Sequence, residues 1–110
     1  MSQYLLLLHH DPSGMSRMSP DEYQKSIEKY MAWRNKPFVV GSQRLAPEPG
    51  RVIREQGRKI SDGPYSETKE ILGGYYLIEA ANYDEAVERT LDHPHLEHGG
   101  TVEIRQLHQM

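Results

Sequence analysis

The chain contains no cysteine among its 110 residues. This absence excludes disulfide bonds, thiolate nucleophiles and cysteine-ligated metal sites, and it is typical of proteins from reducing compartments. The apolar run near the start covers only residues 4–8, far short of the roughly 20 residues that span a bilayer. It also lacks the basic segment and cleavage site of a secretory signal. We therefore expect a cytoplasmic protein without a membrane partner.

Positive charge is also scarce. Lys and Arg together number 13 against 16 Asp and Glu, and no run of basic residues forms a stripe. Direct binding of nucleic acid needs such a basic footprint, because it depends on neutralising phosphates. The sequence patterns of nucleotide-binding loops, serine hydrolases and zinc peptidases are missing as well. We therefore expect neither a nucleic-acid partner nor a bound cofactor.

What is present suits one globular domain over residues 1–110. The hydrophobic fraction of 36% and the charged fraction of 26% are ordinary for a folded domain of this size. Hydrophobic periodicity, caps and breakers predict strands at residues 4–9, 38–45, 75–78 and 101–107, a polar hairpin at residues 51–60, and helices at residues 20–36 and from residue 82 or 84 to about residue 93. This order predicts an α+β fold, a ferredoxin-like antiparallel sheet with both helices on one face and an inserted hairpin.

Two of the predicted strands are apolar on both faces. In residues 4–8 every side chain is apolar or aromatic, and the same holds for residues 75–78. Strands of this kind need cover on both sides of the sheet, whereas the two helices cover only one. With no third helix, the economical cover is the same face of a second copy. The pattern therefore predicts a homodimer.

The densest group of ionisable side chains falls at residues 62–70, a segment that opens with the turn-forming string Asp-Gly-Pro. Two interpretations stay open. The segment is loop architecture alone, or it holds charged side chains at the mouth of a cleft, where opposite charges tune a general acid or base. In the second case a small molecule would be the partner.

The same segment resembles a family signature. The string DGPYSETKE at residues 62–70, followed by GGY at residues 73–75, is similar to the signature of the DGPF-motif branch of the YCII-related family, with Tyr65 in place of the usual Phe. Residues 4–7 and 102–105 look like that family too. The resemblance implies a dimeric α/β-barrel of ferredoxin-like subunits and no known reaction.

The resemblance also implies a His and Asp pair in a cleft, and some relatives occur near or fused to sigma-factor-like regulators. Here the helix at residues 20–36 contains no His, and the second helix is followed by Asp-His-Pro at residues 92–94 rather than Asp-Pro. Two functions therefore stay open: a cofactor-independent enzyme that acts on a small molecule, and a non-catalytic dimer that senses a ligand or docks on a transcription regulator. A purely structural dimer without a cleft is a further alternative.

Histidine supplies the remaining candidates. His9 and His10 end a buried strand, where clefts open, and imidazole suits proton transfer near neutral pH. We predict catalytic roles for His9 and Asp62. The predicted ligand contacts are His10, Tyr65, Glu67, Lys69 and Tyr75.

A second group of histidines follows the second predicted helix. His93, His95 and His98 lie beside Asp92 and Glu97, which together are the ligand types of zinc or nickel. Their spacing matches no established zinc signature, and the segment holds Pro94 and ends in two glycines. We therefore expect an exposed loop and no metal site.

Overall fold

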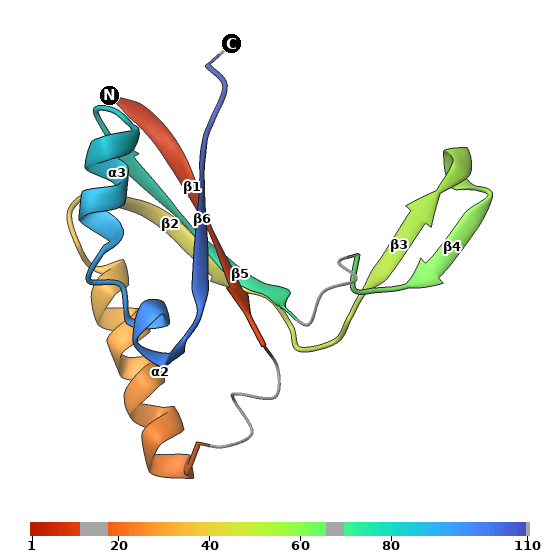
Figure 1. Ribbon diagram of the computed structural model, residues 1–110, viewed down its shortest axis with the longest axis horizontal. Coiled ribbons are helices and arrows are strands. Elements are labelled where there is room, and N and C mark those ends of the chain that lie inside the picture. The colour runs from red at the N-terminus through yellow and green to blue at the C-terminus, as the bar shows by residue number, and fades with distance from the viewer. Residues whose placement is uncertain (12–17, 66–69, 110) are drawn as a thin grey trace.

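A four-stranded antiparallel sheet forms the body of the molecule in the computed structural model, which describes residues 1–11, 18–65 and 70–109 (Figure 1). Its strands are β1 (Ser2–His10), β2 (Val39–Arg44), β5 (Ile71–Ala80) and β6 (Thr101–Gln106). They are arranged in the order β2-β5-β1-β6. The two strands that are apolar on both faces, β1 and β5, therefore lie at the centre, as their pattern requires.

Both helices lie on one side of this sheet (Figure 1). Helix α2 (Pro20–Arg34) begins after Ser19, whose Oγ accepts the backbone N–H of Glu22 at 3.1 Å. Helix α3 (Tyr83–Thr90) begins after Asn82, whose side chain accepts the N–H of Glu85 at 2.9 Å. These side-chain oxygens satisfy backbone donors that the first helical turn leaves unpaired, so the two helix starts follow from the local sequence.

The helix-facing side of the sheet forms the core. The buried residues there are Tyr4, Leu6, Leu8, Tyr76, Ile78 and Ala80 from β1 and β5, with Trp33 of α2 and Ala86 of α3. The opposite side carries Leu5, Leu7, Tyr75 and Leu77, which are only partly buried. Leu5 pairs with Leu77 and Leu7 with Tyr75 across the two strands. We call these four residues the open face.

The predicted hairpin forms a separate two-stranded sheet that projects away from the body on the side opposite the helices (Figure 1). Strands β3 (Arg51–Arg54) and β4 (Lys59–Asp62) are joined by the short 3-10 helix η1 (Glu55–Gly57). Cross-strand pairing sets Ile53 against Ile60, and both side chains are about two-thirds exposed, at 65% and 64%. We call residues 51–62 the arm.

The element order, the two helices and the antiparallel sheet confirm the predicted α+β class. The sheet does not close on itself, because β2 and β6 form its two edges. A barrel is therefore not made by one chain. In the part of the chain that the structure describes, no helix has both the length and the apolar character needed to cross a membrane.

Candidate functional site

His93 and His95 are buried rather than exposed, at 1% and 7% of their full exposure. The prediction of a solvated loop was therefore wrong. After α3 the chain enters a second 3-10 helix, η2 (Pro94–His98), in which Pro94 takes an initial position. The His93 ring packs 4.4 Å from the Trp33 ring and 4.7 Å from the Tyr76 ring, measured between centroids. Aromatic packing against α2 and β5 thus draws this segment into the core.

Two hydrogen bonds fix the protonation of His95. Its Nε2 lies 2.7 Å from the backbone carbonyl oxygen of His9, and its Nδ1 lies 2.7 Å from the hydroxyl of Tyr30. Because a carbonyl oxygen only accepts, Nε2 carries the proton and Nδ1 accepts from Tyr30. Burial lowers the pKa of His95 and so favours this neutral form.

His93 is also held as a single tautomer. Its Nδ1 accepts the backbone N–H of His95 at 3.0 Å, so the neutral ring carries its proton on Nε2. No hydrogen-bond partner for this Nε2 is found among the described residues. Burial lowers the pKa of His93 to about 4, because a charged ring would be desolvated among aromatic neighbours.

Tyr30 connects α2 to both η2 and the sheet. Its hydroxyl donates to His95, and its backbone carbonyl accepts the hydroxyl of Tyr76 at 2.9 Å. Burial raises the pKa of Tyr30 to about 12, so the phenol keeps its proton throughout the physiological range. Tyr30 can therefore donate a hydrogen bond but cannot serve as a resident base.

His10 reaches the same side of the sheet from the end of β1. The strand register shifts between Leu8 and His9, which leaves Gly73 of β5 against the His10 ring. A Cβ atom on Gly73 would lie 2.5 Å from that ring, so any other residue there would require the ring to move. Burial and the nearby Arg44 guanidinium lower the pKa of His10, with Asp11 opposing them. The ring is therefore held neutral at neutral pH, and no hydrogen bond to it is found within the described residues.

Arg44 ends β2 on this side too. Its guanidinium donates a short hydrogen bond to the hydroxyl of Tyr23 on α2, and it lies 5.6 Å from the centre of the Tyr23 ring. Tyr23 and Tyr30 are seven residues apart, which puts them on the same face of the helix. We call His10, Tyr23, Tyr30, Arg44 and His95 the helix–sheet cluster.

The predicted catalytic residue His9 lies on the opposite side of the sheet from His10, because successive side chains of a strand alternate. Its Nε2 is 3.1 Å from the Glu103 carboxylate of β6. The predicted ligand residue Tyr75 belongs to the same side. The two adjacent histidines thus serve different surfaces.

Of the described residues in the charged segment, Glu70 acts on the helix–sheet cluster, because its charge raises the pKa of His95 against the larger lowering by burial. Asp62 ends the arm, where its carboxylate lies 3.2 Å from Arg51. Tyr65 is 76% exposed, with the Arg54 guanidinium 5.4 Å from its ring centre. Glu67 and Lys69 lie outside the described residues. No hydrogen bond or ion pair among the described residues joins His9 with Asp62, so the predicted catalytic roles of these two stay predictions.

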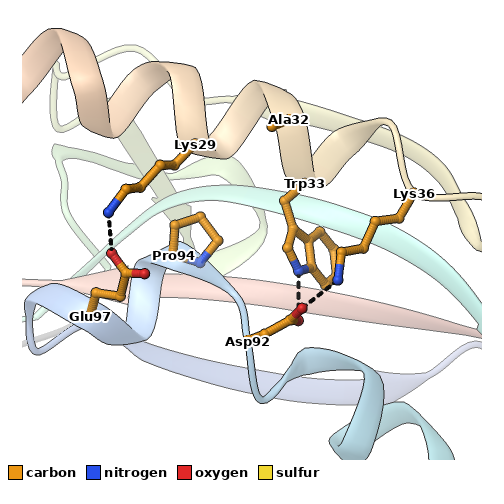
Figure 2. A pocket seen from close by; sticks show the side chains of 7 residues that line it. All are labelled: Lys29, Ala32, Trp33, Lys36, Asp92, Pro94 and Glu97. Atoms are coloured by element: carbon orange, nitrogen blue, oxygen red, sulfur yellow. Dashed lines mark hydrogen bonds and ion pairs between the residues drawn. The ribbon is translucent and has the colours of Figure 1, made fainter.

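Two surface pockets lie beside the helices, and one of the two is lined by residues of α2. One, of about 340 Å³, lies between α2 and η2, and Figure 2 shows its ion pairs: Lys29 with Glu97 at 2.9 Å, and Lys36 with Asp92. The indole N–H of Trp33 also donates to Asp92 at 2.9 Å. The second pocket, of about 360 Å³, shares Lys36 and Asp92.

The charges in these pockets satisfy one another. Hydrogen bonds from Lys36 and Trp33 lower the pKa of Asp92, so its carboxylate stays charged and tied to α2. These contacts hold η2 and the end of α3 against α2, which keeps His93 and His95 in place. We therefore assign a structural role to the residues that line these two pockets. The candidate site is the helix–sheet cluster. Among the described residues, no group of three or more His, Cys, Asp or Glu side chains is arranged to hold a metal ion.

Four members of the cluster were not among the sequence-based site candidates, namely Tyr23, Tyr30, Arg44 and His95. His95 was predicted to lie in an exposed loop. The spacing of Tyr23 and Tyr30 on one helix face was a usable signal for the first two. Arg44 carried no local signal, because its role depends on which strand β2 pairs with. His10 was predicted as a ligand contact, and the structure places it in the cluster.

Comparison with known proteins matches nearly the whole chain to one family description. The YCII-related domain covers residues 2–110. An uncharacterized protein of Rhizobium meliloti (strain 1021) is 31% identical over 112 residues, which span 94% of this chain and 90% of that protein. Neither match carries an activity with it.

Proposed function

The chain belongs to the YCII-related family, and we propose that it is a cofactor-independent enzyme that transfers a proton on a small molecule bound at the helix–sheet cluster. The observation that carries the proposal is His10, a partly buried imidazole whose pKa is lowered beside Arg44 and whose ring has no hydrogen-bond partner within the described residues. A neutral imidazole of this kind is a base ready to accept a proton.

The neighbours of His10 suit such a step. The rings of His10 and His95 lie 6.4 Å apart between centroids, and His95 is hydrogen-bonded to the Tyr30 hydroxyl. His10 would take a proton from the bound molecule and return it to another atom of the same molecule. The hydrogen bonds of His95 to Tyr30 and to the His9 carbonyl would fix the position of its ring beside His10 during this transfer. An isomerisation of this kind needs no redox partner, so atoms and electrons balance without a cofactor.

Deuterium exchange tests the proposal. Small metabolites, both neutral compounds and anionic carboxylates and phosphates, are incubated with the protein in D2O, and loss of C–H signals is followed by proton NMR. We expect exchange into at least one compound, slowed at least about a hundredfold in His10→Gln, since general base catalysis contributes factors of this size. His108→Gln, at an exposed position, is the matched control and should exchange as the wild type does.

A ligand-sensing module is the second candidate. The hydrogen bond between Tyr30 and His95 favours this function, because the Tyr30 hydroxyl and both ring nitrogens of His95 already have partners. A thermal-shift measurement on the same compounds separates the two functions, because any ligand that binds only the folded state raises the melting temperature. Binding without exchange supports sensing, including a role beside a transcription regulator. Exchange that depends on His10 supports the enzyme.

We also propose that two copies associate through the open face to form a dimeric α/β-barrel of ferredoxin-like subunits, as in the DGPF-motif branch that the DGPY string resembles. The strand order β2-β5-β1-β6 supports the subunit fold. Leu5, Leu7, Tyr75 and Leu77 support the interface, because a cluster of apolar side chains at the centre of a sheet favours contact with another protein surface.

A further inference from the structure

Arg44 differs from several other arginines of the chain in having no carboxylate partner. Arg51, Arg89 and Arg105 lie 3.2, 2.9 and 3.8 Å from Asp or Glu oxygens. Arg44 instead donates to the neutral hydroxyl of Tyr23 and lies over its ring, and it has no carboxylate partner within the described residues. Its side chain is therefore held in place while its charge is left uncompensated.

Besides burial, Arg44 lowers the pKa of His10, whereas the Asp11 carboxylate raises it. Gly73 links Arg44 to His10, because the N–H of Leu45 donates to the Gly73 carbonyl at 2.9 Å while the His10 ring packs on the same glycine. Among the charged groups that act on His10, Arg44 has a larger effect than Asp11. The environment of His10 is therefore net positive. The Tyr30 phenol, which Arg44 also influences, keeps its proton.

The sheet beneath these residues carries little side-chain bulk. Gly74 pairs with Leu8 on one side and with Arg44 on the other, so no side chain stands between those two residues on the helix-facing side. Close packing enforces this, because a Cβ on Gly74 would lie 2.9 Å from the Gln43 carbonyl oxygen. The backbone of Gly73 and Gly74, the Arg44 guanidinium and the neutral His10 ring are therefore neighbours at this end of the sheet.

We propose that Arg44, positioned by Tyr23, binds an anionic group of the small molecule on which His10 acts, a carboxylate or a phosphate. This inference rests on the proposed function and names its substrate class. The planar guanidinium matches two oxygens of either group, and the imidazole of His10 supplies a further contact. A substrate without an anionic group would leave Arg44 unpaired.

NMR titration of the histidine ring protons tests the inference with sodium acetate and inorganic phosphate as separate probes. The His10 signal is assigned by its loss in His10→Gln. A bound anion neutralises Arg44, so saturating probe should raise the pKa of His10, and the probe concentration at half-effect reports affinity. We expect Arg44→Gln to weaken binding of the preferred probe at least about tenfold, since hydrogen bonds to charged groups are worth this much.

Two further variants sharpen the test. Arg58→Gln removes an exposed arginine of the arm, whose guanidinium donates a hydrogen bond to Gln56, so this variant should bind the probes as the wild type does. Tyr23→Phe keeps the ring and removes the hydroxyl, so its affinity should fall between those of the wild type and Arg44→Gln. Circular dichroism checks that each variant is folded.

Unchanged affinity and unchanged His10 pKa in folded Arg44→Gln would overturn the inference, as would a lack of response to both probes. A stronger response to acetate or to phosphate identifies the preferred group and supports it. The outcome is separable from the proposed function. Anion binding at Arg44 without any deuterium exchange supports the subsite and refutes the enzyme. Exchange into neutral compounds alone supports the enzyme and refutes the anion subsite.

Discussion

A buried imidazole is most stable when each ring nitrogen has a partner suited to its protonation. His95 meets this condition on both sides, through the His9 carbonyl and the Tyr30 hydroxyl. His93 meets it on one side, since its Nε2–H has no hydrogen-bond partner in the described residues and is surrounded by the rings of Trp33, Tyr76 and Tyr30. Neither site accommodates a second proton without breaking an existing contact.

Acidification should therefore destabilise the fold. The pKa of His93 falls from 6.5 in the unfolded chain to about 4 in the folded protein, so the unfolded state binds more protons between these values. Stability is fully present above pH 6.5 and is lost as the pH falls through this window. We expect the free energy of unfolding at pH 5 to be about 2 kcal/mol lower than at pH 7.5.

Urea denaturation at the two pH values measures this difference. His93→Gln should show a weaker pH dependence, because the titrating group is gone. His108→Gln, which removes an exposed histidine, should behave as the wild type does. Equal pH dependence in wild type and His93→Gln would show that His93 does not titrate in this range.

Tyr30→Phe isolates the hydrogen bond to His95. The substitution keeps the ring and leaves Nδ1 of a buried imidazole without its donor. An unpaired buried acceptor costs about 1–3 kcal/mol, so urea denaturation should show a loss of that size. Tyr65→Phe, at a hydroxyl on a 76% exposed side chain, should change stability by less than about 0.5 kcal/mol. An equal effect of both substitutions would contradict the assigned bond.

At the scale of elements, the site exists because β1, β2 and α2 converge at one end of the sheet. The register shift in β1–β5 pairing brings Gly73 under His10, and β2 pairing brings Arg44 beside Gly74. The η2 segment then inserts His95 between β1 and α2. Each element contributes one or two polar side chains, and the geometry depends on all of them packing together.

Gly73→Ala should disturb this arrangement locally. Its Cβ would lie 2.5 Å from the His10 ring, which must then move away from Gly73. Gly41→Ala is the matched control, since a Cβ there meets nothing within 4 Å. We expect Gly73→Ala to shift the His10 ring signals and its NMR titration, and Gly41→Ala to leave both as in the wild type. Identical His10 spectra in the two variants would show that the ring does not pack on Gly73.

At the scale of the whole molecule, two apolar surfaces stay partly uncovered in a single chain. The open face leaves four apolar side chains partly exposed at the centre of the sheet. The arm exposes Ile53 and Ile60, and an isolated two-stranded hairpin is marginally stable in water. The proposed association of two copies through the open face would cover the first of these surfaces.

A charge on the open face should separate the copies. Leu77→Glu places a carboxylate among apolar neighbours, and burying an uncompensated charge in an interface is strongly unfavourable. Light scattering after size exclusion should report a dimer for the wild type and a monomer for Leu77→Glu. Glu79→Gln, an exposed position of the same strand, should remain dimeric. A monomeric wild type would refute the dimer.

Local patterning alone determined the class of the fold. Apolar runs with no polar alternation marked β1 and β5 as central strands, while Ser19 with Pro20, and Asn82, marked the helix starts. The Asp-Gly-Pro string marked a turn, and the catalytic role predicted for Asp62 stays a prediction. These signals are short-range, so a single sequence reveals them.

The sequence by itself therefore determined the elements and the central strands, and it predicted His10 as a ligand contact. Only the tertiary structure decided that His10 rather than His9 faces the helices, that His93 and His95 are buried, and that Arg44 acts on His10. The physical reason is that burial, tautomer and charge depend on contacts between residues far apart in the chain. His95 and Tyr30 are 65 residues apart in the chain, yet Nδ1 of His95 lies 2.7 Å from the Tyr30 hydroxyl. No local sequence pattern predicts this contact.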